Sequence, residues 1–432
     1  MKSLRTYIRK VLVAILTLEA RLVLRKYRPR IVAITGSVGK TSTKDAIGSV
    51  LDRHFFVRKS EKSFNSEIGV PLTVLGAANA WSDMLRWARV CLEGFGLILL
   101  PNHYPRWLVL EVGADRPGDI KSLSSWITSE IVVITRFPDV PVHIEYFKSG
   151  EEVATEKQHL IKTLTPEGTL VLNADDRAVL GSAALFHGNV ITYGFSEGAH
   201  VRATHENVLY EKGAPVGMGF RIEYRGSSVP CEIHGALGKS HISGALAAAA
   251  VGLASGVNLV DAAQDLKLHI PPPGRLRILP GLSGSTLIDD TYNSSPAAAE
   301  VAIETLQSIE TKGKRIAVLG DMLELGSHSV EAHKELGAEL GKGIDHLYAV
   351  GIRARDIAES AQKAGLSSSA ITIFANSKEG AEVIPKEIAK GDIVLIKGSQ
   401  SIRLERVTGA LLAPGIVAKD VLVRQEAEWL AR

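Results

Sequence analysis

Short apolar runs alternate with amphipathic segments along most of the chain. In the first half, buried strands are predicted at residues 31–35, 108–112, 131–135, 169–173 and 190–194, where aliphatic side chains follow one another. Helices are predicted between them at residues 41–52, 81–100 and 151–164. Residues 199–234 differ, because short runs broken by glycine and proline predict antiparallel strands, and an alanine-rich buried helix follows at 244–255.

A clear linker divides the chain at residues 270–274, where three consecutive prolines can continue neither a helix nor a sheet ladder. The alternation then resumes. Strands are predicted at residues 286–289, 316–320, 346–350, 371–374 and 392–396, and helices at 297–309 and 328–341. Strands that alternate with helices in this way predict an α/β fold with a parallel sheet in each half.

The first 30 residues form a separate pattern. Leu4, Ile8, Val11, Ile15, Leu18 and Leu22 recur at spacings of three and four, which predicts one apolar stripe along a helix. Nine basic side chains accompany this stripe against a single acid. Two interpretations stay open: the helix packs on the rest of the chain, for example against the helix at 81–100, or it lies on an anionic membrane surface.

Charge and cysteine content limit the classes of function. The net charge of the whole chain is +3. Residues 1–30 carry more positive charge than this, because they hold nine basic residues and one acid, so the rest of the chain is acidic. Nucleic-acid binding is therefore not expected of the rest of the chain. The two cysteines lie far apart without metal-ligand spacing, which favours a reducing, cytoplasmic location. No apolar stretch reaches the roughly 18–20 residues that a membrane span requires.

A phosphate-binding loop follows the first strand. The sequence Thr35-Gly-Ser-Val-Gly-Lys-Thr-Ser-Thr43 places glycines where a tight turn needs them and opens directly into a helix. Candidate nucleotide contacts are Gly36, Ser37, Gly39, Lys40, Thr41 and Ser42, with Lys40 facing the outer phosphates and the Thr41 hydroxyl placed to ligate Mg²⁺. The loop is one residue shorter than the usual form. It predicts that the protein binds ATP.

Further motifs occur in a fixed order along the chain. They are Asn65-Ser-Glu-Ile-Gly69, Glu111-Val-Gly-Ala-Asp115, His143-Ile-Glu-Tyr-Phe147, Ala154-Thr-Glu-Lys157, Pro273-Gly-Arg275, Asp289-Asp-Thr-Tyr-Asn293, Leu319-Gly-Asp-Met-Leu-Glu-Leu-Gly326 and Lys397-Gly-Ser399. With the phosphate loop, this set resembles the Mur ligases, which are ATP-dependent amide-forming enzymes of peptidoglycan synthesis. Within that family, it is most similar to the branch that adds D-alanyl-D-alanine to a muramyl tripeptide.

The resemblance implies a site with two Mg²⁺ ions. Glu111 stands at the carboxyl end of a predicted strand beside the loop, where a carboxylate can hold a metal. By resemblance, Thr41, Glu111, His143 and a carbamylated Lys157 are the metal ligands, and Lys40, Glu111, His143 and Lys157 are the catalytic set. From the residues alone, Lys157 also fits an ordinary solvated helix, and Glu156 and Gln158 depart from the small neighbours that the family has at this lysine.

The resemblance also gives roles to residues of the second half. Arg275 is expected to reach back to the nucleotide phosphates, and Asp290 and Asn293 to bind the ribose and the adenine edge. Asp321, Glu324, Lys397, Ser399 and Arg403 are the expected substrate contacts; an arginine suits a carboxylate of the substrate. Ser240-His241 replaces a His-Asn pair of the family, which leaves that adenine contact open.

These observations predict three segments: a basic amphipathic helix at 1–30, a phosphate-loop ATPase domain with a parallel sheet at 31–271, and a Rossmann-like α/β domain at 272–432. By resemblance, the chain is a monomeric, ADP-forming ligase of a muramyl peptide and a D-amino-acid dipeptide. The family's N-terminal UDP-sugar domain is expected to be absent, since about thirty residues precede the first strand. A lipid-linked acceptor with peripheral contact at the inner membrane face, and a non-catalytic nucleotide-binding subunit, are the alternatives.

Overall fold

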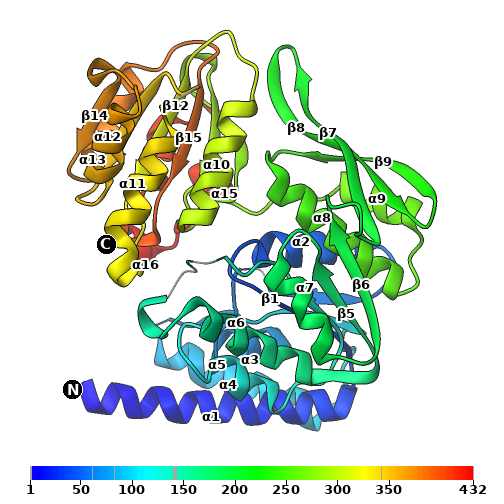
Figure 1. Cartoon of the computed structure of the whole chain (residues 1–432). Helices are drawn as coiled ribbons and strands as arrows, with labels where there is room; N and C mark the ends of the chain where they lie inside the picture. The colour runs from blue at the N-terminus through cyan, green and yellow to red at the C-terminus, as the bar shows by residue number, and fades with distance from the viewer. Residues whose placement is uncertain are drawn as a thin grey trace.

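Two β-sheets, each covered by helices, make up the body of the protein in a computed structural model of the chain (Figure 1). The structure describes residues 2–60, 62–81, 83–138, 140, 144–341 and 343–431, with the backbone alone considered for 2–6. All strands of the first sheet lie within residues 30–234 and all strands of the second within 277–397. The sheets therefore separate at the predicted proline linker.

The first sheet has nine strands in the order β2-β3-β1-β4-β5-β6-β7-β8-β9. Their bounds are β1 Arg30–Thr35, β2 Val57–Lys59, β3 Trp107–Glu111, β4 Ser129–Ile134, β5 Leu164–Asn173, β6 Asn189–Gly194, β7 Val201–Glu211, β8 Ala214–Tyr224 and β9 Ser227–His234. Neighbours pair in parallel from β2 to β7, and β7-β8-β9 pair antiparallel. The predicted antiparallel strands thus extend the parallel sheet and make it mixed.

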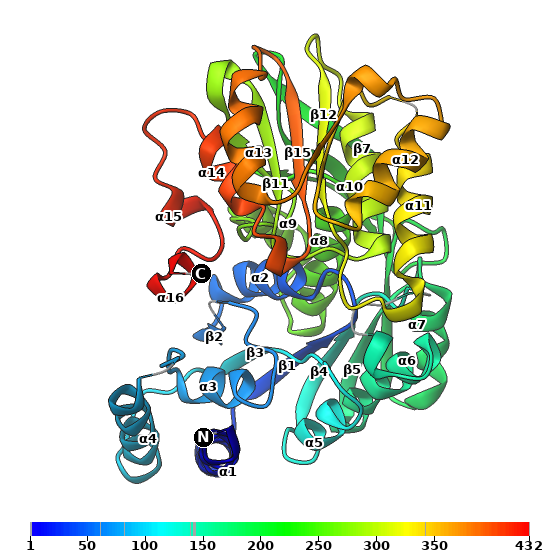
Figure 2. The same cartoon turned by 90° about the vertical axis from the view of Figure 1, so that its left-hand side faces the viewer.

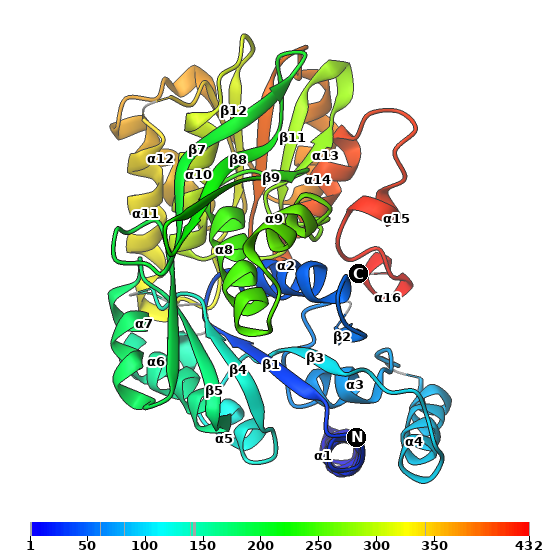
Figure 3. The same cartoon turned by 90° about the vertical axis from the view of Figure 1, so that its right-hand side faces the viewer.

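Helices cover both faces of this sheet because successive residues of its buried strands point to opposite sides. Val32 and Ile34 of β1 pack with the core under α2 and α8, whereas Ile31 and Ala33 pack with the core on the other face. The helices are α2 Lys40–Asp52, α3 Gly69–Leu75, α4 Met84–Leu99, α5 Asp119–Ser124, α6 Gly150–Gln158, α7 Arg177–Gly181, α8 Lys239–Ala254 and α9 Leu259–Lys267. Figure 3 shows α2, α8 and α9 on one face and α3 and α5 on the other. The predicted helix at 151–164 ends at Gln158 and continues as a 3-10 helix, His159–Thr163.

The second sheet has six strands in the order β10-β11-β15-β12-β13-β14. They are β10 Arg277–Pro280, β11 Thr286–Asp290, β12 Arg315–Gly320, β13 His346–Val350, β14 Ile371–Phe374 and β15 Ile393–Lys397, parallel except at β10. Its helices are α10 Pro296–Ser308, α11 Ser329–Glu339, α12 Ala354–Lys363, α13 Ser377–Val383 and α14 Glu405–Leu411, followed by the short α15 Ala418–Val421 and α16 Ala427–Leu430. Figure 2 shows this sheet beyond α2, on the far side from the N-terminal helix.

The N-terminal helix α1, Lys2–Tyr27, packs on α3 and α4. Leu16, Ala20 and Val23 are its fully buried side chains. The predicted apolar stripe does not supply this packing, because its described members, Ile8 to Leu22, are exposed. The helix therefore carries two apolar faces, and the core-facing one was not predicted. No helix within the described residues is long and apolar enough to cross a membrane.

Polar contacts at the end of α1 fix it to α4. The Lys26 ammonium donates to the carbonyl oxygens of Leu97, Ile98 and Leu100 at 2.9, 3.0 and 2.6 Å. These carbonyls belong to the last turn of α4, where a cation is favourable because helix C-termini carry partial negative charge. The ring of Tyr27 also stacks on Tyr104 at 4.5 Å between centroids. The helix is thus joined to the body at its carboxyl end.

A buried carboxyl in this interface predicts a pH-dependent stability. Glu19 is 7% exposed, its Oε2 has no hydrogen-bond partner among the described residues, and burial raises its pKa from 4.5 to about 7. A carboxyl whose pKa is raised by folding stabilises the fold at low pH, and this contribution is lost as the pH rises from about 4.5 to about 7. Glu19→Gln should therefore be more stable than the wild type at pH 8, by about 1–3 kcal/mol in the free energy of unfolding, and should be nearly as stable as the wild type at pH 5.

The measurement is thermal unfolding followed by circular dichroism across this pH range. Glu93→Gln serves as the matched control, because Glu93 lies on the adjacent α4 but is exposed and paired with Arg89 at 2.8 Å. A difference between Glu19→Gln and the wild type that does not change with pH would contradict the burial of a titrating carboxyl at α1.

Candidate nucleotide and substrate site

The phosphate loop lies between β1 and α2 in a conformation that requires glycine at two positions. Gly36 has φ +142°, and a Cβ atom there would come within 2.0 Å of Thr135 Oγ1. Gly39 has φ +86° and directly precedes α2. Thr135, the residue after β4, closes the loop, since its hydroxyl donates to Val38 O at 2.6 Å. The N-terminus of α2 is therefore open to an anion, as the motif predicts.

Lys40 lies over this loop, where its ammonium donates to Gly36 O at 2.8 Å. Burial lowers the pKa of Lys40, and the nearby Glu111 carboxylate opposes that shift. Ser37 lies in the same loop with a buried hydroxyl that has no hydrogen-bond partner among the described residues. A half-buried cation and an unpartnered hydroxyl beside a helix N-terminus fit the phosphate groups of a nucleotide.

Glu111 and Thr41 meet beside the loop. Thr41 Oγ1 donates to Glu111 Oε2 at 3.0 Å, and Asn65 Nδ2 holds the other carboxylate oxygen at 3.0 Å. Glu111 is 1% exposed, and Ser63 Oγ lies 2.8 Å from Thr41 Oγ1. A carboxylate next to a phosphate-loop hydroxyl is a donor set that suits Mg²⁺. Within the described residues no group of three or more His, Cys, Asp and Glu gathers as a metal site, and the predicted ligand His143 lies outside those residues.

Lys157 is buried on α6 and lines the same cavity as Lys40 and Glu111. Burial lowers the pKa of Lys157 to about 7, and the positive charge of Lys40 adds to this shift. No hydrogen bond or ion pair joins its Nζ to a described residue. At neutral pH a large fraction of this amine is therefore uncharged, unlike a lysine in solvent.

Glu156 and Gln158, the two neighbours of Lys157 that depart from the family pattern, have local structural roles. Glu156 Oε1 accepts hydrogen bonds from the backbone N–H groups of Ile120 and Lys121 at 2.8 and 3.1 Å, which caps α5. Gln158 Nε2 donates to Ser182 Oγ at 3.0 Å. Both side chains support the segments around α6, so their size does not prevent Lys157 from lining the cavity.

Arg275 follows the linker and reaches the phosphate loop, while its contact with nucleotide phosphates stays a prediction. Its Nη2 lies 3.5 Å from Thr41 Oγ1, and its guanidinium lies over the ring of Tyr292 at 4.0 Å from the centroid. The Arg275 carbonyl oxygen is 2.6 Å from His241 Nε2, which ties the linker to α8. Tyr292 and Asn65 were missed as site residues, although both lie inside motifs that sequence analysis had singled out.

Two cavities meet at the loop and at Arg275. The smaller, about 340 Å³, is lined by Lys40, Thr41, Glu111 and Lys157 on one side and by Tyr292, Asn293 and Glu324 on the other. The larger, about 660 Å³, extends from Ser42 and Gly39 between α8 and α10, and it includes His241, Asp290 and Lys397. Each cavity is lined by residues from both halves of the chain, so the second half completes the site.

The residues predicted to bind the nucleoside lie in two different environments. Asp290 is buried and accepts a 2.7 Å hydrogen bond from Lys397 Nζ at the wall of the larger cavity. Asn293 lines the smaller cavity instead, where its side-chain oxygen accepts from Gln400 N at 3.4 Å. Lys397, predicted to meet a substrate carboxylate, thus already has an internal carboxylate partner in this structure.

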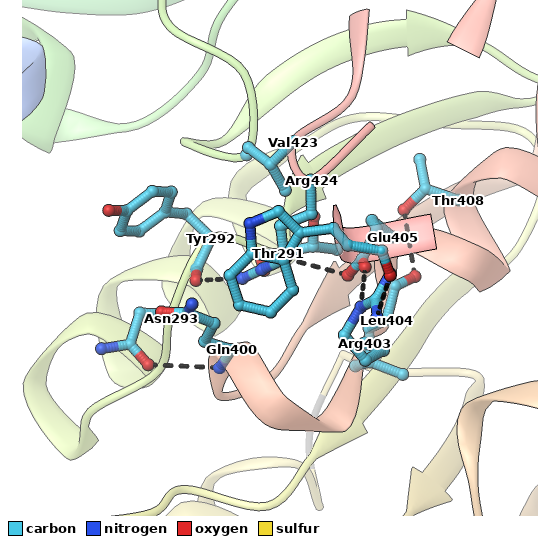
Figure 4. Close-up of polar contacts among 12 residues, drawn as sticks. Thr291, Tyr292, Asn293, Gln400, Arg403, Leu404, Glu405, Thr408, Val423 and Arg424 are labelled. Atoms are coloured by element: carbon cyan, nitrogen blue, oxygen red, sulfur yellow. Dashed lines mark hydrogen bonds and ion pairs between the residues drawn. The ribbon is translucent and has the colours of Figure 1, made fainter. Parts of the chain in front are cut away.

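Three of the predicted substrate residues line neither cavity. The Asp321 carboxylate accepts from the backbone N–H groups of Arg353 and Ala354 at 3.0 and 2.8 Å and so caps α12. Ser399 Oγ joins two loops by accepting from Leu323 N at 2.9 Å. Arg403 pairs with Glu405, which Arg424 also contacts at 2.9 Å (Figure 4). Direct substrate contact by these three residues stays a prediction. The other two predicted substrate residues, Glu324 and Lys397, line the cavities.

Comparison with known families agrees with this geometry. The Mur ligase middle domain matches residues 34–85 and 98–252, and the Mur ligase glutamate ligase domain matches residues 274–400. The chain belongs to the Mur ligase family. The two matches divide this Mur ligase at the proline linker, and together they include every predicted site residue except Arg403.

Individual relatives point to one branch of the Mur ligases. The UDP-N-acetylmuramoyl-tripeptide–D-alanyl-D-alanine ligase of Bacillus subtilis (strain 168) is 30% identical over 394 residues, covering 91% of this chain and 78% of the relative. The enzyme of that name from Escherichia coli (strain K12) is 27% identical over 397 residues. The MurF ligase of Thermotoga maritima, solved in complex with ADP, superposes with a TM-score of 0.74 at 26% identity and covers 92% of this chain and 83% of that one.

Proposed function

We propose that this Mur ligase is an ATP-dependent, ADP-forming carboxylate–amine ligase that adds D-alanyl-D-alanine to a muramyl peptide. The observation that carries the proposal is the meeting of the phosphate loop, Glu111, Lys157 and Arg275 at one cavity. The relatives with that printed activity support the choice of substrates. We also propose the division into residues 1–30, 31–271 and 272–432 and a monomeric enzyme.

ATP binding in this proposal uses both cavities. The loop N–H groups, Lys40 and Arg275 would hold the phosphates, because they supply fixed positive charge around one point. The larger cavity, beside Ser42 and the loop, would take the nucleoside, with His241 and Asp290 on its wall. The ADP complex of the Thermotoga maritima relative supports a nucleotide site in this family.

Magnesium would be held by Thr41 and Glu111, with Asn65 orienting the carboxylate. When bound, Mg²⁺ neutralises charge on the phosphate oxygens that face the acceptor carboxylate. His143 and Lys157 are proposed as the ligands of a second ion. For Lys157 this requires carbamylation: the uncharged amine adds to CO₂, an N–C bond forms as one C=O π bond opens, and one proton leaves, so the neutral amine becomes an anionic carbamate. Its lowered pKa supports this step, because only the uncharged amine reacts.

The chemistry then needs little covalent participation from the protein. A carboxylate oxygen of the muramyl peptide forms a bond to the γ-phosphorus while the bond to ADP breaks, which gives an acyl phosphate. The amine of the dipeptide attacks the acyl carbon, loses a proton and displaces phosphate. Lys40 and Arg275 stabilise the charge that develops at the phosphoryl group, and the second half of the chain excludes water from the cavity.

Phosphate release coupled to amide formation tests the proposal. The assay uses ATP, Mg²⁺, D-alanyl-D-alanine and one of two acceptors, a UDP-linked muramyl tripeptide or the same peptide on a lipid carrier. We expect one phosphate per amide product with at least one acceptor and neither product when the dipeptide is omitted. ATP binding without either product would favour a non-catalytic nucleotide-binding subunit. Product only from the lipid-linked acceptor would change the substrate and keep the reaction.

A further inference from the structure

Two helices at one end of the protein present apolar side chains to solvent. On α1 these are Ile8, Val11, Ile15, Leu18 and Leu22, and on α4 they are Met84, Leu85, Leu92, Phe95 and Leu99. We call these ten residues the α1–α4 face. The two helices lie side by side, at the end of the molecule farthest from the second sheet (Figures 1 and 2). Exposed apolar residues gathered in this way usually mark an interaction surface.

The composition of α4 cannot be explained by packing in the core. Its inner residues Trp87, Val90 and Gly94 are buried, as an amphipathic helix requires. Its opposite side is also apolar, and Leu85 and Leu92 are 84% and 71% exposed. The inner side of such a helix packs in the core, and its outer apolar side can contact a membrane or another apolar surface.

The helix α1 and most of α4 lie outside the regions that match the family. The middle-domain match begins at residue 34 and omits residues 86–97, which form most of α4. The family core therefore does not account for either helix, yet the two pack on each other and are joined through Lys26. No described residue of either helix lines the two cavities. Their shared surface is thus separate from the ligase site.

Unpaired cations border the apolar residues. Lys10, Arg21 and Arg25 of α1, and Arg28 directly after it, are exposed and form no ion pair with a described residue. Helical spacing places Arg21 beside Leu18 and Arg25 beside Leu22, each three residues away. The single acid among the described side chains of α1 is Glu19, which is buried. An apolar stripe with basic residues at its border is the composition of a helix that lies in a membrane interface.

We propose that the α1–α4 face docks the protein on a bilayer that contains anionic lipids. The apolar residues of both helices would enter the boundary between headgroups and acyl chains, and Lys10, Arg21, Arg25 and Arg28 would meet lipid phosphates. A second copy of the chain fits less well, because a symmetric contact would bring the same cations opposite one another. The docking extends beyond the ligase reaction and does not depend on it.

Co-sedimentation with vesicles tests this docking with the full chain. One set of vesicles contains equal parts of phosphatidylcholine and phosphatidylglycerol, and the other contains phosphatidylcholine alone. We expect binding to the anionic set at low salt and at least about tenfold weaker binding to the neutral set or at high salt. The variant Leu85→Ser/Leu92→Ser/Phe95→Ser and the variant Arg21→Glu/Arg25→Glu should each weaken binding to anionic vesicles by about tenfold or more.

Matched controls separate this effect from general surface changes. Val330→Ser/Ile352→Ser/Val417→Ser removes three exposed apolar residues elsewhere, and Lys378→Glu/Lys386→Glu reverses two exposed charges. Both control variants should bind vesicles like the wild type. All variants should retain phosphate release with soluble substrates, so a failed ligase proposal and a failed docking proposal give different results.

Three outcomes would overturn the docking. In the first, the wild type does not sediment with anionic vesicles, and in the second, the α4 triple variant binds as well as the wild type. In the third outcome, sedimentation equilibrium without vesicles would show a dimer that the α4 triple variant dissociates, which would assign the face to a second copy.

Discussion

Replacing Lys40 with alanine is expected to reduce phosphate release and amide formation by on the order of a thousandfold. Lys40 lies over the phosphate loop with its ammonium on Gly36 O at 2.8 Å, and burial has already removed much of its hydration. Its charge therefore acts at the position where the transferred phosphoryl group develops charge. Alanine leaves the loop backbone intact but removes this cation. The measurement is kcat for coupled phosphate release at saturating ATP.

Lys121→Ala is the matched control, because Lys121 is an exposed lysine on α5 that lines neither cavity. It should retain wild-type turnover, and Lys40→Ala should unfold at nearly the wild-type temperature. If Lys40→Ala kept more than about a tenth of the wild-type rate, the loop would bind something other than the reacting phosphates.

The parts of this site that were predicted from sequence are local in the chain. The strand, the two glycines, Lys40 and Thr41 lie within twelve residues, so their geometry follows from one turn between β1 and α2. Glu111 was also predictable, because parallel strands β1 and β3 end at the same edge of the sheet. Its partner Asn65 was not, since a loop residue between α2 and α3 can be placed only by the tertiary fold.

Long-range pairing explains the other differences between expectation and structure. Lys397 and Asp290 are 107 residues apart and meet because β15 and β11 are neighbours in the second sheet, an order that periodicity does not specify. The orientation of α1 is a second case. Its two apolar faces are comparable in sequence, and only contact with α3 and α4 decides that Leu16, Ala20 and Val23 turn inward. The helix α12 was not predicted, although its buried residues Ala354, Ile357, Ala358 and Ala361 recur at helical spacing.

The site depends on residues from both halves of the chain, which has consequences for how it can work. Arg275 contacts Thr41 of the phosphate loop and lies on Tyr292, so the linker joins the two halves at the reacting phosphates. Further contacts between the halves occur near the C-terminus, where the ring of Trp429 meets Trp81 edge-on at 6.5 Å. Any movement of the second half must therefore change the charge around the phosphate loop as well as the volume of both cavities.

Replacing Lys157 with alanine should lower turnover by on the order of a hundredfold or more, and a small anion should restore part of it. The physical reason is the proposed carbamate, which presents carboxylate oxygens where the unmodified side chain presents an amine. Burial and the charge of Lys40 lower the pKa of Lys157 to about 7, so the uncharged amine that reacts with CO₂ is abundant near neutral pH and becomes scarce as the pH falls below that value.

Rescue by added ions distinguishes an anion from a cation at this position. Formate or acetate should partly restore the Lys157→Ala variant, and methylammonium should not, because it replaces an ammonium group. In the wild type, ¹³CO₂ should give a carbamate carbon signal in the ¹³C spectrum that weakens below pH 7 and is absent from Lys157→Ala. Lys162→Ala, an exposed lysine in the following 3-10 helix, should keep both the signal and the activity. Rescue by methylammonium and not by formate would show that the lysine acts as a cation.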